Sequence, residues 1–268
     1  MPRLIILLLL ISEFACAAGE PFPIGAKSWG MGNAMVAVPH TQSFFNNSAG
    51  LSFLENNSAS ASYHSRFQIA GLQTVALSGN FITKKMALGV GVQQFGDKLY
   101  NEKQVGLALA KNTGRVSLSI KASLLQAAVE NVATKSTLLT EFGVLAKLSS
   151  KINVGFHAYN LTGAKLFYSQ HVPTVLRLGL AYSPIKQVLL ATEAEKSLLF
   201  PMVYKFGLDY QLVSNIHIRT GLSSQQRTAH FGLGFQNKKY VFDYAFSSNQ
   251  ALGTSHHLTL TLKIGYEK

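Results

Sequence analysis

Residues 258–266 read LTLTLKIGY, so that large apolar side chains alternate with threonine, lysine and glycine. Successive side chains of a β-strand point to opposite faces of the sheet, so this spacing predicts a strand with one apolar face. The other face carries small and polar groups. This combination is typical of the wall of a membrane β-barrel, where residues facing lipid alternate with residues facing the lumen.

The same alternation recurs from residue 57 onward; residues 230–235, for example, read HFGLGF. The second face consists mainly of Gly, Ala and Ser, which suits the crowded inside of a barrel better than the polar face of a soluble β-sandwich. We therefore predict an all-β fold, a transmembrane antiparallel β-barrel of about 14 strands with an N-terminal hatch segment. The expected strands are 57–67, 72–83, 86–95, 103–112, 115–127, 137–148, 152–161, 174–183, 187–195, 202–213, 216–224, 228–237, 240–247 and 256–267.

Tight and longer connections alternate between these strands. The tight ones are 83–85, 112–114, 149–151, 184–186, 214–215 and 237–239, and the longer ones are 96–102, 128–136, 162–173, 196–201, 224–227 and 248–255. Barrels of the bacterial outer membrane have short periplasmic turns and longer outer loops. The alternation of tight and longer connections therefore predicts a multi-pass barrel in the cell outer membrane with both termini on the periplasmic side.

Basic residues gather at the tight connections. There they would face the anionic phospholipid head groups of the inner leaflet, an interaction of about 1 kcal/mol per basic residue near the surface. The alternative is that lysines in turns keep the strand ends soluble, and both interpretations keep the topology. The residues are Lys84, Lys85, Lys111, Arg115, Lys147, Lys151, Lys186, Lys238, Lys239 and Lys268.

The first 18 residues have the layout of a secretory signal peptide. Arg3 supplies a positive charge, the apolar run Leu4–Ile11 is too short for a spanning helix, and small residues precede a cleavage site after Ala18. We therefore expect a signal peptide at 1–18, a hatch or plug at 19–56 and a barrel at 57–268. Cleavage removes Cys16, the sole cysteine, and with it any internal disulfide or thiolate metal site.

The composition fits a membrane protein better than an enzyme or a nucleic-acid-binding protein. Of 268 residues, 47% are hydrophobic and 13% are charged, about half the charged fraction usual in soluble domains. The formal charge is +12, but export argues against nucleic acid as a partner. No segment resembles a nucleophile elbow, and the adjacent His256 and His257 point to opposite faces of a strand, so we expect no catalytic residue, metal site or cofactor.

Four charged residues are expected to form a row inside the barrel. In an antiparallel pair, residues whose numbers are symmetric about the connection lie opposite each other. By this rule, Arg177 faces Glu193, Glu193 faces Asp209, and Asp209 faces Arg219. We interpret this row as a packing network that fills the lumen rather than as a pathway for a solute, because buried charges are paired whatever their role.

Residues 19–56 do not alternate and contain two glycine-bearing motifs, GAKSWGMGNAMVAV at 25–38 and NSAGL at 47–51. Glycine permits tight turns and close backbone approach, so this segment is expected to fold into the lumen as a hatch. The residues that we single out in it are Gly25, Ser28, Trp29, Gly30, Met31, Gly32, Asn47, Ala49, Gly50 and Leu51.

These motifs resemble the N-terminal signature of the PorV/PorQ-type outer-membrane barrels, which belong to the wider FadL-like group. In that family a GARSxGMGxAxVAV element precedes an NPAGL element. Here Ser48 replaces the proline, and Pro39-His40 replaces an acidic pair. The resemblance implies an outer-membrane barrel with a hatch and a link to the type IX secretion system, in which such barrels shuttle cargo or cover or plug the translocon.

Two functions remain open. The first is a non-enzymatic envelope partner that binds a secretion translocon or another envelope complex, supported by the motifs and the charge-paired lumen. The second is FadL-like transport of small hydrophobic solutes, supported by the hatch and the Gly-rich inner faces. No apolar pocket is evident in the outer loops, and the connection 162–173, with Leu166, Phe167 and Tyr168, is their apolar candidate for contact with a solute.

Overall fold

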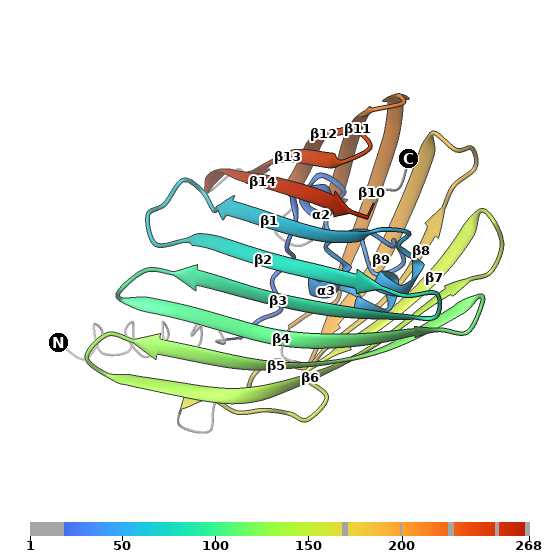
Figure 1. The fold of residues 1–268 in the computed structure, drawn as a ribbon. Helices are drawn as coiled ribbons and strands as arrows, with labels where there is room; N and C mark the ends of the chain where they lie inside the picture. Colours follow the sequence, from blue (N-terminus) through green and yellow to red (C-terminus); the bar gives the residue numbers. More distant parts are fainter. Residues whose placement is uncertain (1–18, 168–170, 199, 225–227, 250–251, 266–268) are drawn as a thin grey trace.

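Fourteen antiparallel strands form one closed barrel, in which each strand pairs with its neighbours in sequence and β1 pairs with β14 (Figure 1). The computed structural model describes residues 19–167, 171–198, 200–224, 228–249 and 252–265, so the signal peptide expected at 1–18 lies outside them. Closure leaves no strand edge unpaired, which is a condition for spanning a bilayer with strands. The strands are β1 Asn57–Ser65, β2 Gln73–Ile82, β3 Met86–Gly96, β4 Tyr100–Asn112, β5 Val116–Val129, β6 Ala133–Lys147, β7 Ile152–Tyr159, β8 Val175–Tyr182, β9 Val188–Ser197, β10 Val203–Val213, β11 Ile216–Ser223, β12 Thr228–Gln236, β13 Tyr240–Asn249 and β14 Gly253–Ile264.

The predicted strand count is confirmed, and each predicted strand overlaps an observed one. The main difference concerns β4, β5 and β6, which continue past their expected ends. As a result, two connections predicted to be long, 96–102 and 128–136, shrink to 97–99 and 130–132. Backbone pairing between these strands continues beyond the residues whose side chains alternate between apolar and polar. The wall is therefore taller on this side of the barrel (Figure 1).

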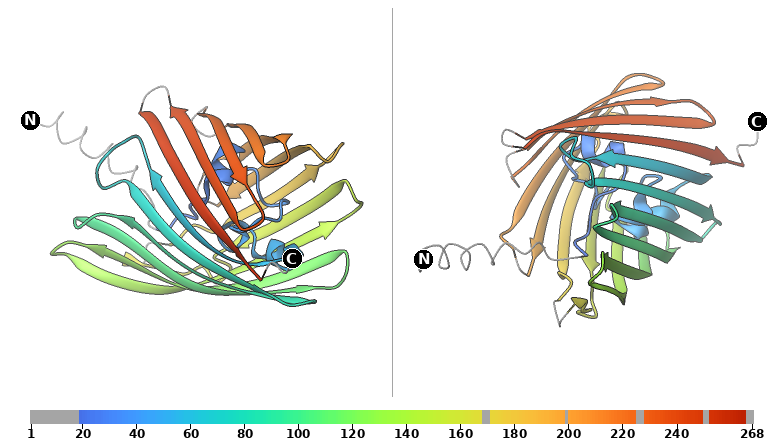
Figure 2. Two further views of the ribbon diagram at one scale, coloured as in Figure 1. Left: turned by 45° about the horizontal axis from the view of Figure 1, so that its top comes forward. Right: turned by 90° about the vertical axis from the view of Figure 1, so that its left-hand side faces the viewer.

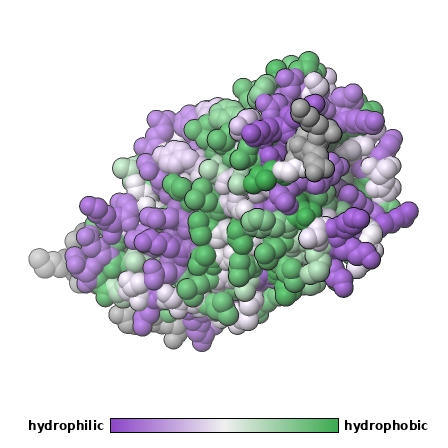
Figure 3. Space-filling model, in the orientation of Figure 1, coloured by the Kyte–Doolittle hydropathy of each residue, from purple (hydrophilic) through white to green (hydrophobic). Residues whose placement is uncertain are grey.

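Inner and outer faces alternate along the strands as the sequence predicts. In β8, Leu176, Leu178 and Leu180 are exposed, whereas Val175 and Arg177 are buried. Such outward leucines, valines and aromatic residues recur around the wall. An apolar band crosses the visible face of the molecule between two hydrophilic ends (Figure 3). None of the helices in the described part of the chain is long and apolar enough to cross a membrane.

The two ends of the barrel differ in their connections. We call the end with the connections 83–85, 113–115, 148–151, 183–187, 214–215 and 237–239 the turn end, and the opposite end the loop end. The loop end carries the connection 160–174, which is longer than any other between the strands.

The described chain ends lie at opposite ends of the barrel, which differs from the expectation that both termini share one side. Ile264 closes β14 at the turn end. Gly19 lies at the loop end, hydrogen-bonded to Glu102 near the start of β4 and to Tyr159 at the end of β7. The reason is that residues 19–56 run through the lumen before Asn57 begins β1 at the turn end.

Residues 19–56, which we call the plug, lie inside the ring of strands (Figure 2). The plug contains the short helices α2 (Ala26–Gly30) and α3 (Ser43–Asn46) and the 3-10 helix η2 (Ser48–Phe53). Two of the buried apolar clusters join it to the wall. One packs residues 34–38 and Met31 against Ala181 and Ala191, and the other packs Phe44 and Leu51 against small residues of β3 and β4.

Glycines on the inner face of the wall allow the plug backbone to approach closely. A Cβ added at Gly221 of β11 would overlap the backbone nitrogen of Gly32, and one at Gly155 of β7 would overlap the carbonyl oxygen of Val36. The Gly-rich inner faces noted in the sequence therefore serve, at these positions, to seat the plug.

Candidate functional site

All four residues of the predicted charge row are buried on the inner face, but their order differs from the prediction. β8 and β9 pair so that Arg177 lies opposite Glu195. β9 and β10 pair so that Glu193 lies opposite Lys205, and Asp209 lies opposite Leu189. Of the three expected cross-strand pairs, Asp209 with Arg219 is present.

Two of the predicted pairs were wrong because each hairpin was assumed to be symmetric about the middle of its expected connection. The paired residues of β9 and β10 are symmetric about position 199 rather than 201. A shift by an even number of residues keeps each side chain on its face but changes its neighbour. The like-charged contact expected between Glu193 and Asp209 is therefore absent, and a lysine lies beside Glu193 instead.

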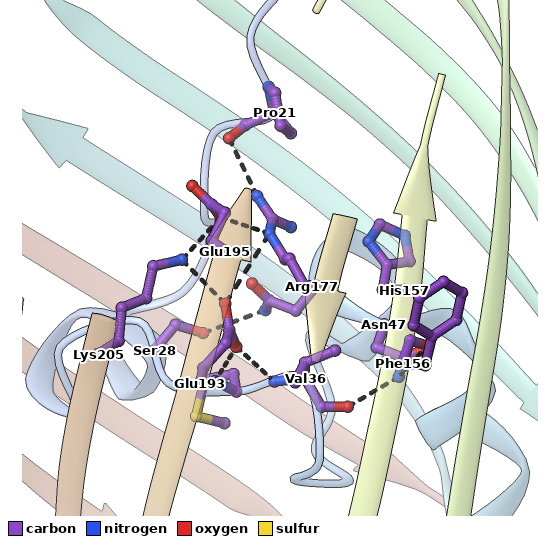
Figure 4. Close-up of polar contacts among 12 residues, drawn as sticks. Pro21, Ser28, Val36, Asn47, Phe156, His157, Arg177, Glu193, Glu195 and Lys205 are labelled. Carbon is purple, nitrogen blue, oxygen red and sulfur yellow. Dashed lines mark hydrogen bonds and ion pairs between the residues drawn. The ribbon is translucent and has the colours of Figure 1, made fainter. Parts of the chain in front are cut away.

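Arg177, Glu193, Glu195 and Lys205 form one charge cluster (Figure 4). Lys205 Nζ lies 2.9 Å from Glu193 Oε1 and 2.7 Å from Glu195 Oε2. Arg177 Nε lies 2.6 Å from Glu195 Oε2 and 3.9 Å from Glu193 Oε1. Two cations and two carboxylates balance within the cluster, which limits the cost of burying each charge.

Glu193 also holds the plug. Its Oε2 accepts hydrogen bonds of 2.9 Å from the backbone N–H groups of Met35 and Val36 (Figure 4). Hydrogen bonds to a carboxylate are roughly twice as strong as those between neutral groups. Glu193 therefore connects the wall to the plug backbone.

A second group of charges surrounds Asp209. Its Oδ2 lies 3.1 Å from Lys27 Nζ of the plug and 3.2 Å from Arg219 Nε, and its Oδ1 lies 2.9 Å from His217 Nδ1. Arg219 in turn contacts Asp243 at 2.6 Å. This second group thus adds an ion pair between Lys27 of the plug and Asp209 of the wall.

Asn47 of the second motif links three segments. Its Nδ2 donates to the carbonyl oxygens of Val36 (2.7 Å), Val144 (3.1 Å) and Phe156 (3.3 Å). Its Oδ1 accepts from the N–H of Ala49, which caps η2. Asn47 therefore joins the two motif regions to each other and to β6 and β7.

The other motif residues lie inside the plug or against the wall. Gly25 and Gly32 have φ of +103° and +60°, which favours glycine. Ser28 donates to the Ile24 carbonyl oxygen and accepts from Asn46. Gly30 faces Gly232, Met31 faces Gly207, Gly50 faces Ser43, and Leu51 faces Gly89.

Trp29 lies at the boundary between the plug and an open part of the lumen. Its indole N–H donates to the Pro23 carbonyl oxygen at 2.9 Å. Its ring stacks on His257 with centroids 4.0 Å apart, and His257 stacks on His64 at 3.6 Å. In the described residues no group of three histidine, cysteine, aspartate or glutamate side chains is arranged to hold a metal ion.

A cavity of about 660 Å³ lies between the plug and the loop end. Residues 20–23 and Trp29 of the plug line it, and the connections 66–72, 160–174 and 198–202 contribute to its wall. Its charged lining residues are Glu20, Arg66, Glu102, Glu195 and Lys205. The aromatic lining includes Phe22, Trp29, Phe95, Tyr100, Phe167 and Phe200.

The sequence pointed to part of this site. Phe167 of the predicted apolar connection lines the cavity and Leu166 packs beneath it in a buried cluster, whereas Tyr168 lies outside the described residues. Glu195 and Lys205 were missed, although their inner-face positions in β9 and β10 follow the same alternation as Glu193 and Asp209.

Buried His40 of the plug is neutral at ordinary pH. Burial lowers its pKa to about 3, and the positive charge of nearby Lys27 adds to this shift. Its ring lies 3.2 Å from Asn46 Nδ2 and accepts from the Gln42 N–H at 3.2 Å. Protonation of His40 therefore destabilises the folded plug.

The sequence matches no family model and no curated protein. Several solved structures share its fold. The toluene transporter TodX of Pseudomonas putida aligns with a TM-score of 0.69 and 12% identity, over 88% of this chain and 96% of that one. The monoaromatic hydrocarbon channel CymD gives 0.64 and 14%, over 90% and 96%. A FadL homologue of Pseudomonas aeruginosa gives 0.63 and 13%, over 92% and 100%. The chain thus has the fold of these FadL-type barrels.

Proposed function

We propose that the protein is an outer-membrane transporter of small hydrophobic solutes, and that the cavity between plug and loop end binds the solute. The cavity itself carries this proposal. Its volume of about 660 Å³ lies within the range of roughly 300–1,000 Å³ that is usual for small-molecule sites. Aromatic residues share its apolar lining with prolines and valines, and aromatic faces suit contact with small apolar or aromatic solutes.

The outer surface supports the membrane location. Apolar side chains such as Leu107, Ile120 and Leu178 are more than half exposed on the wall, an arrangement that water disfavours and a bilayer core accommodates. The fold shared with TodX and CymD supports the solute class, since those structures are described as a toluene transporter and a monoaromatic hydrocarbon channel.

The sole tryptophan of the chain, Trp29, lines the cavity and supplies a direct test. Toluene added to the purified barrel in detergent is expected to change Trp29 fluorescence in a saturable way. Phe167→Gln places a polar group in the cavity wall and is expected to weaken binding by roughly tenfold or more. Leu161→Gln is the matched control, because Leu161 is exposed on the same connection.

A fluorescence change that never saturates, or one that Leu161→Gln reduces as strongly as Phe167→Gln, would contradict the proposed site. Uptake of radiolabelled toluene by intact cells with and without the barrel in their outer membrane then separates transport from binding alone.

The role of envelope partner in type IX secretion rests on the two plug motifs. Their residues Met31, Asn47, Ala49 and Leu51 are buried in the lumen, where they contact the plug and the wall. The matched structures named above are transporters and channels or a FadL homologue. A native pull-down from outer membranes discriminates the two proposals: recovery of a translocon favours the partner, and recovery of the barrel with a bound apolar solute favours transport.

A further inference from the structure

The first described residue, Gly19, is held by two strands far from it in sequence. Its backbone nitrogen donates to Glu102 Oε1 of β4 at 3.1 Å. Its carbonyl oxygen accepts from the Tyr159 hydroxyl of β7 at 2.8 Å. Tyr100 donates to the same oxygen of Glu102 at 2.5 Å and so orients the carboxylate. Both backbone polar groups of Gly19 therefore have a dedicated partner on the wall.

The space around Gly19 accepts only glycine. Its φ is +80°, a conformation that L side chains rarely adopt. An added Cβ would lie 2.7 Å from Leu125 Cδ2 and 3.1 Å from Val172 Cγ1. Both neighbours belong to a buried apolar cluster and have little room to move.

Negative charge accumulates around this position. Burial raises the pKa of Glu20, and the negative charges of Glu195 and Glu102 add to the rise, while Arg66 opposes it. The charged and titratable groups that face the start of the plug are Glu102 and Tyr100 of β4, Tyr159 of β7, Arg177 of β8, Glu195 of β9 and Arg66. One additional positive charge at Gly19 would offset part of this acidic excess.

We propose that cleavage after Ala18 leaves the ammonium group of Gly19 in an ion pair with Glu102, and that this pair fixes the start of the plug beside the cavity. The small residues Cys16 and Ala18, at the −3 and −1 positions, predict the cleavage site there in the sequence. Hydrolysis by an export-associated peptidase adds one water to the Ala18–Gly19 bond, and gives a carboxylate on Ala18 and an ammonium on Gly19. The neutral amide donor at 3.1 Å then becomes a charged donor, which forms a stronger hydrogen bond.

The pair matters for the cavity because the next residues line it. Glu20, Pro21, Phe22 and Pro23 all belong to the lining. The Pro21 carbonyl oxygen accepts from Arg177 at 3.5 Å and that of Pro23 from Trp29 at 2.9 Å, so this segment is held along its length. Glu102 and Tyr159 thus act as positioning residues for one wall of the cavity.

The test begins with the protein purified from outer membranes. Its intact mass is expected to show Gly19 as the first residue. Acetylation of the α-amino group, followed by mass spectrometry over a pH series, is expected to be at least tenfold slower in the folded than in the denatured protein, because the ion pair keeps the amine protonated. Glu102→Gln is expected to raise the folded-state rate by about tenfold, which corresponds to about one pKa unit.

Glu130→Gln is the matched control, since Glu130 is an exposed acid at the same end of the barrel. It is expected to leave the labelling rate unchanged. A mature chain that begins at another residue, or an amine that reacts equally fast in the folded and denatured protein, overturns the proposal. If Glu102→Gln does not fold, the pH profile of the wild type decides: an ion pair shifts the midpoint of the folded-state profile to higher pH, whereas exclusion of the reagent by packing lowers the rate equally at every pH and would overturn the proposal. None of these measurements requires a solute.

Discussion

At the scale of single residues, Glu193 shows how one carboxylate serves both wall and plug. One of its oxygens pairs with Lys205, and the other accepts from two backbone N–H groups of the plug. The side chain is buried, so water cannot replace these contacts when the carboxylate is lost. The same residue therefore contributes to stability of the barrel and to placement of the plug beneath the cavity.

Glu193→Ala is expected to lower the free energy of unfolding by about 3–5 kcal/mol, because it leaves two plug amides without their acceptor and leaves buried Lys205 and Arg177 to share the carboxylate of Glu195. Urea unfolding measures the change, and limited proteolysis of the plug reports its release. Glu130→Ala, at an exposed position, is expected to change stability by less than about 0.5 kcal/mol. A loss below about 1 kcal/mol for Glu193→Ala would show that the plug does not depend on this residue.

His40 predicts an acid sensitivity of the plug. Its pKa in the folded protein, about 3, lies below the ordinary value of 6.5, so the unfolded state binds the proton more readily. Stability contributed by neutral His40 is therefore present above pH 6.5 and is lost as pH falls toward 3. Down to about pH 4.5 the loss is about 3 kcal/mol.

His40→Gln removes this titration and keeps a polar side chain. The difference in unfolding free energy between wild type and variant, measured from about pH 7 to about pH 4.5, is expected to shift in favour of the variant as pH falls. Parallel curves for the two proteins would contradict the assignment of His40 as the titrating group.

At the scale of elements, the plug and the inner wall have matched shapes. β11 brings Gly221 against Gly32 of the plug, at a distance that leaves no room for a Cβ. The plug carries no long helix that could stand alone, so its conformation depends on these contacts with the strands.

Gly221→Val is expected to displace the plug without preventing barrel closure. The expected readouts are faster proteolysis within residues 19–56 and a raised ion conductance across planar bilayers. Gly79→Ala is the control, because Gly79 faces outward and an added Cβ would make ordinary contact with Val90 at 3.4 Å. Equal ion conductance of the Gly221→Val and Gly79→Ala variants would show that the close fit between plug and wall does not close the lumen.

At the scale of the whole molecule, exposed positive charge is concentrated at the turn end. Cations occupy five of its six connections and therefore surround the barrel rather than form one patch. Lipids surround a barrel on all sides, whereas a protein partner contacts one side, so this distribution favours anionic head groups. The exposed residues are Lys84, Lys85, Lys111, Arg115, Lys151, Lys186, Lys238 and Lys239.

Neutralising Lys84, Lys85, Lys238 and Lys239 to glutamine is expected to reduce the enrichment of phosphatidylglycerol over phosphatidylethanolamine around the barrel by roughly tenfold or more. Mass spectrometry of lipids retained after extraction from vesicles of equal parts of the two measures this ratio. The control neutralises Lys98, Lys103, Lys135 and Lys165, which are exposed at the loop end. An equal effect of both sets would mean that net charge, and not its place, determines lipid binding.

The alternation of apolar with small or polar residues was enough to predict the barrel, its strand number and the facing of Glu193 and Asp209, because side-chain direction in a strand depends only on local geometry. The absence of this alternation from residues 19–56, together with their glycines, led to the prediction that this segment folds into the lumen. Register was decided by the tertiary structure: pairing of β9 with β10 about position 199 gave Glu193 a lysine neighbour, since loop shape and not numbering sets which residues meet.

The cavity and the course of the plug also required the folded chain. Residues as distant as Gly19, Glu102 and Tyr159 meet only after the barrel closes around the plug, and no local pattern marks them as neighbours. The sequence by itself determined which face each strand residue occupies, because that is a property of the extended backbone. The tertiary structure alone decided which charges pair and where the lumen stays open, because these depend on how fourteen strands and one buried segment fill a shared interior.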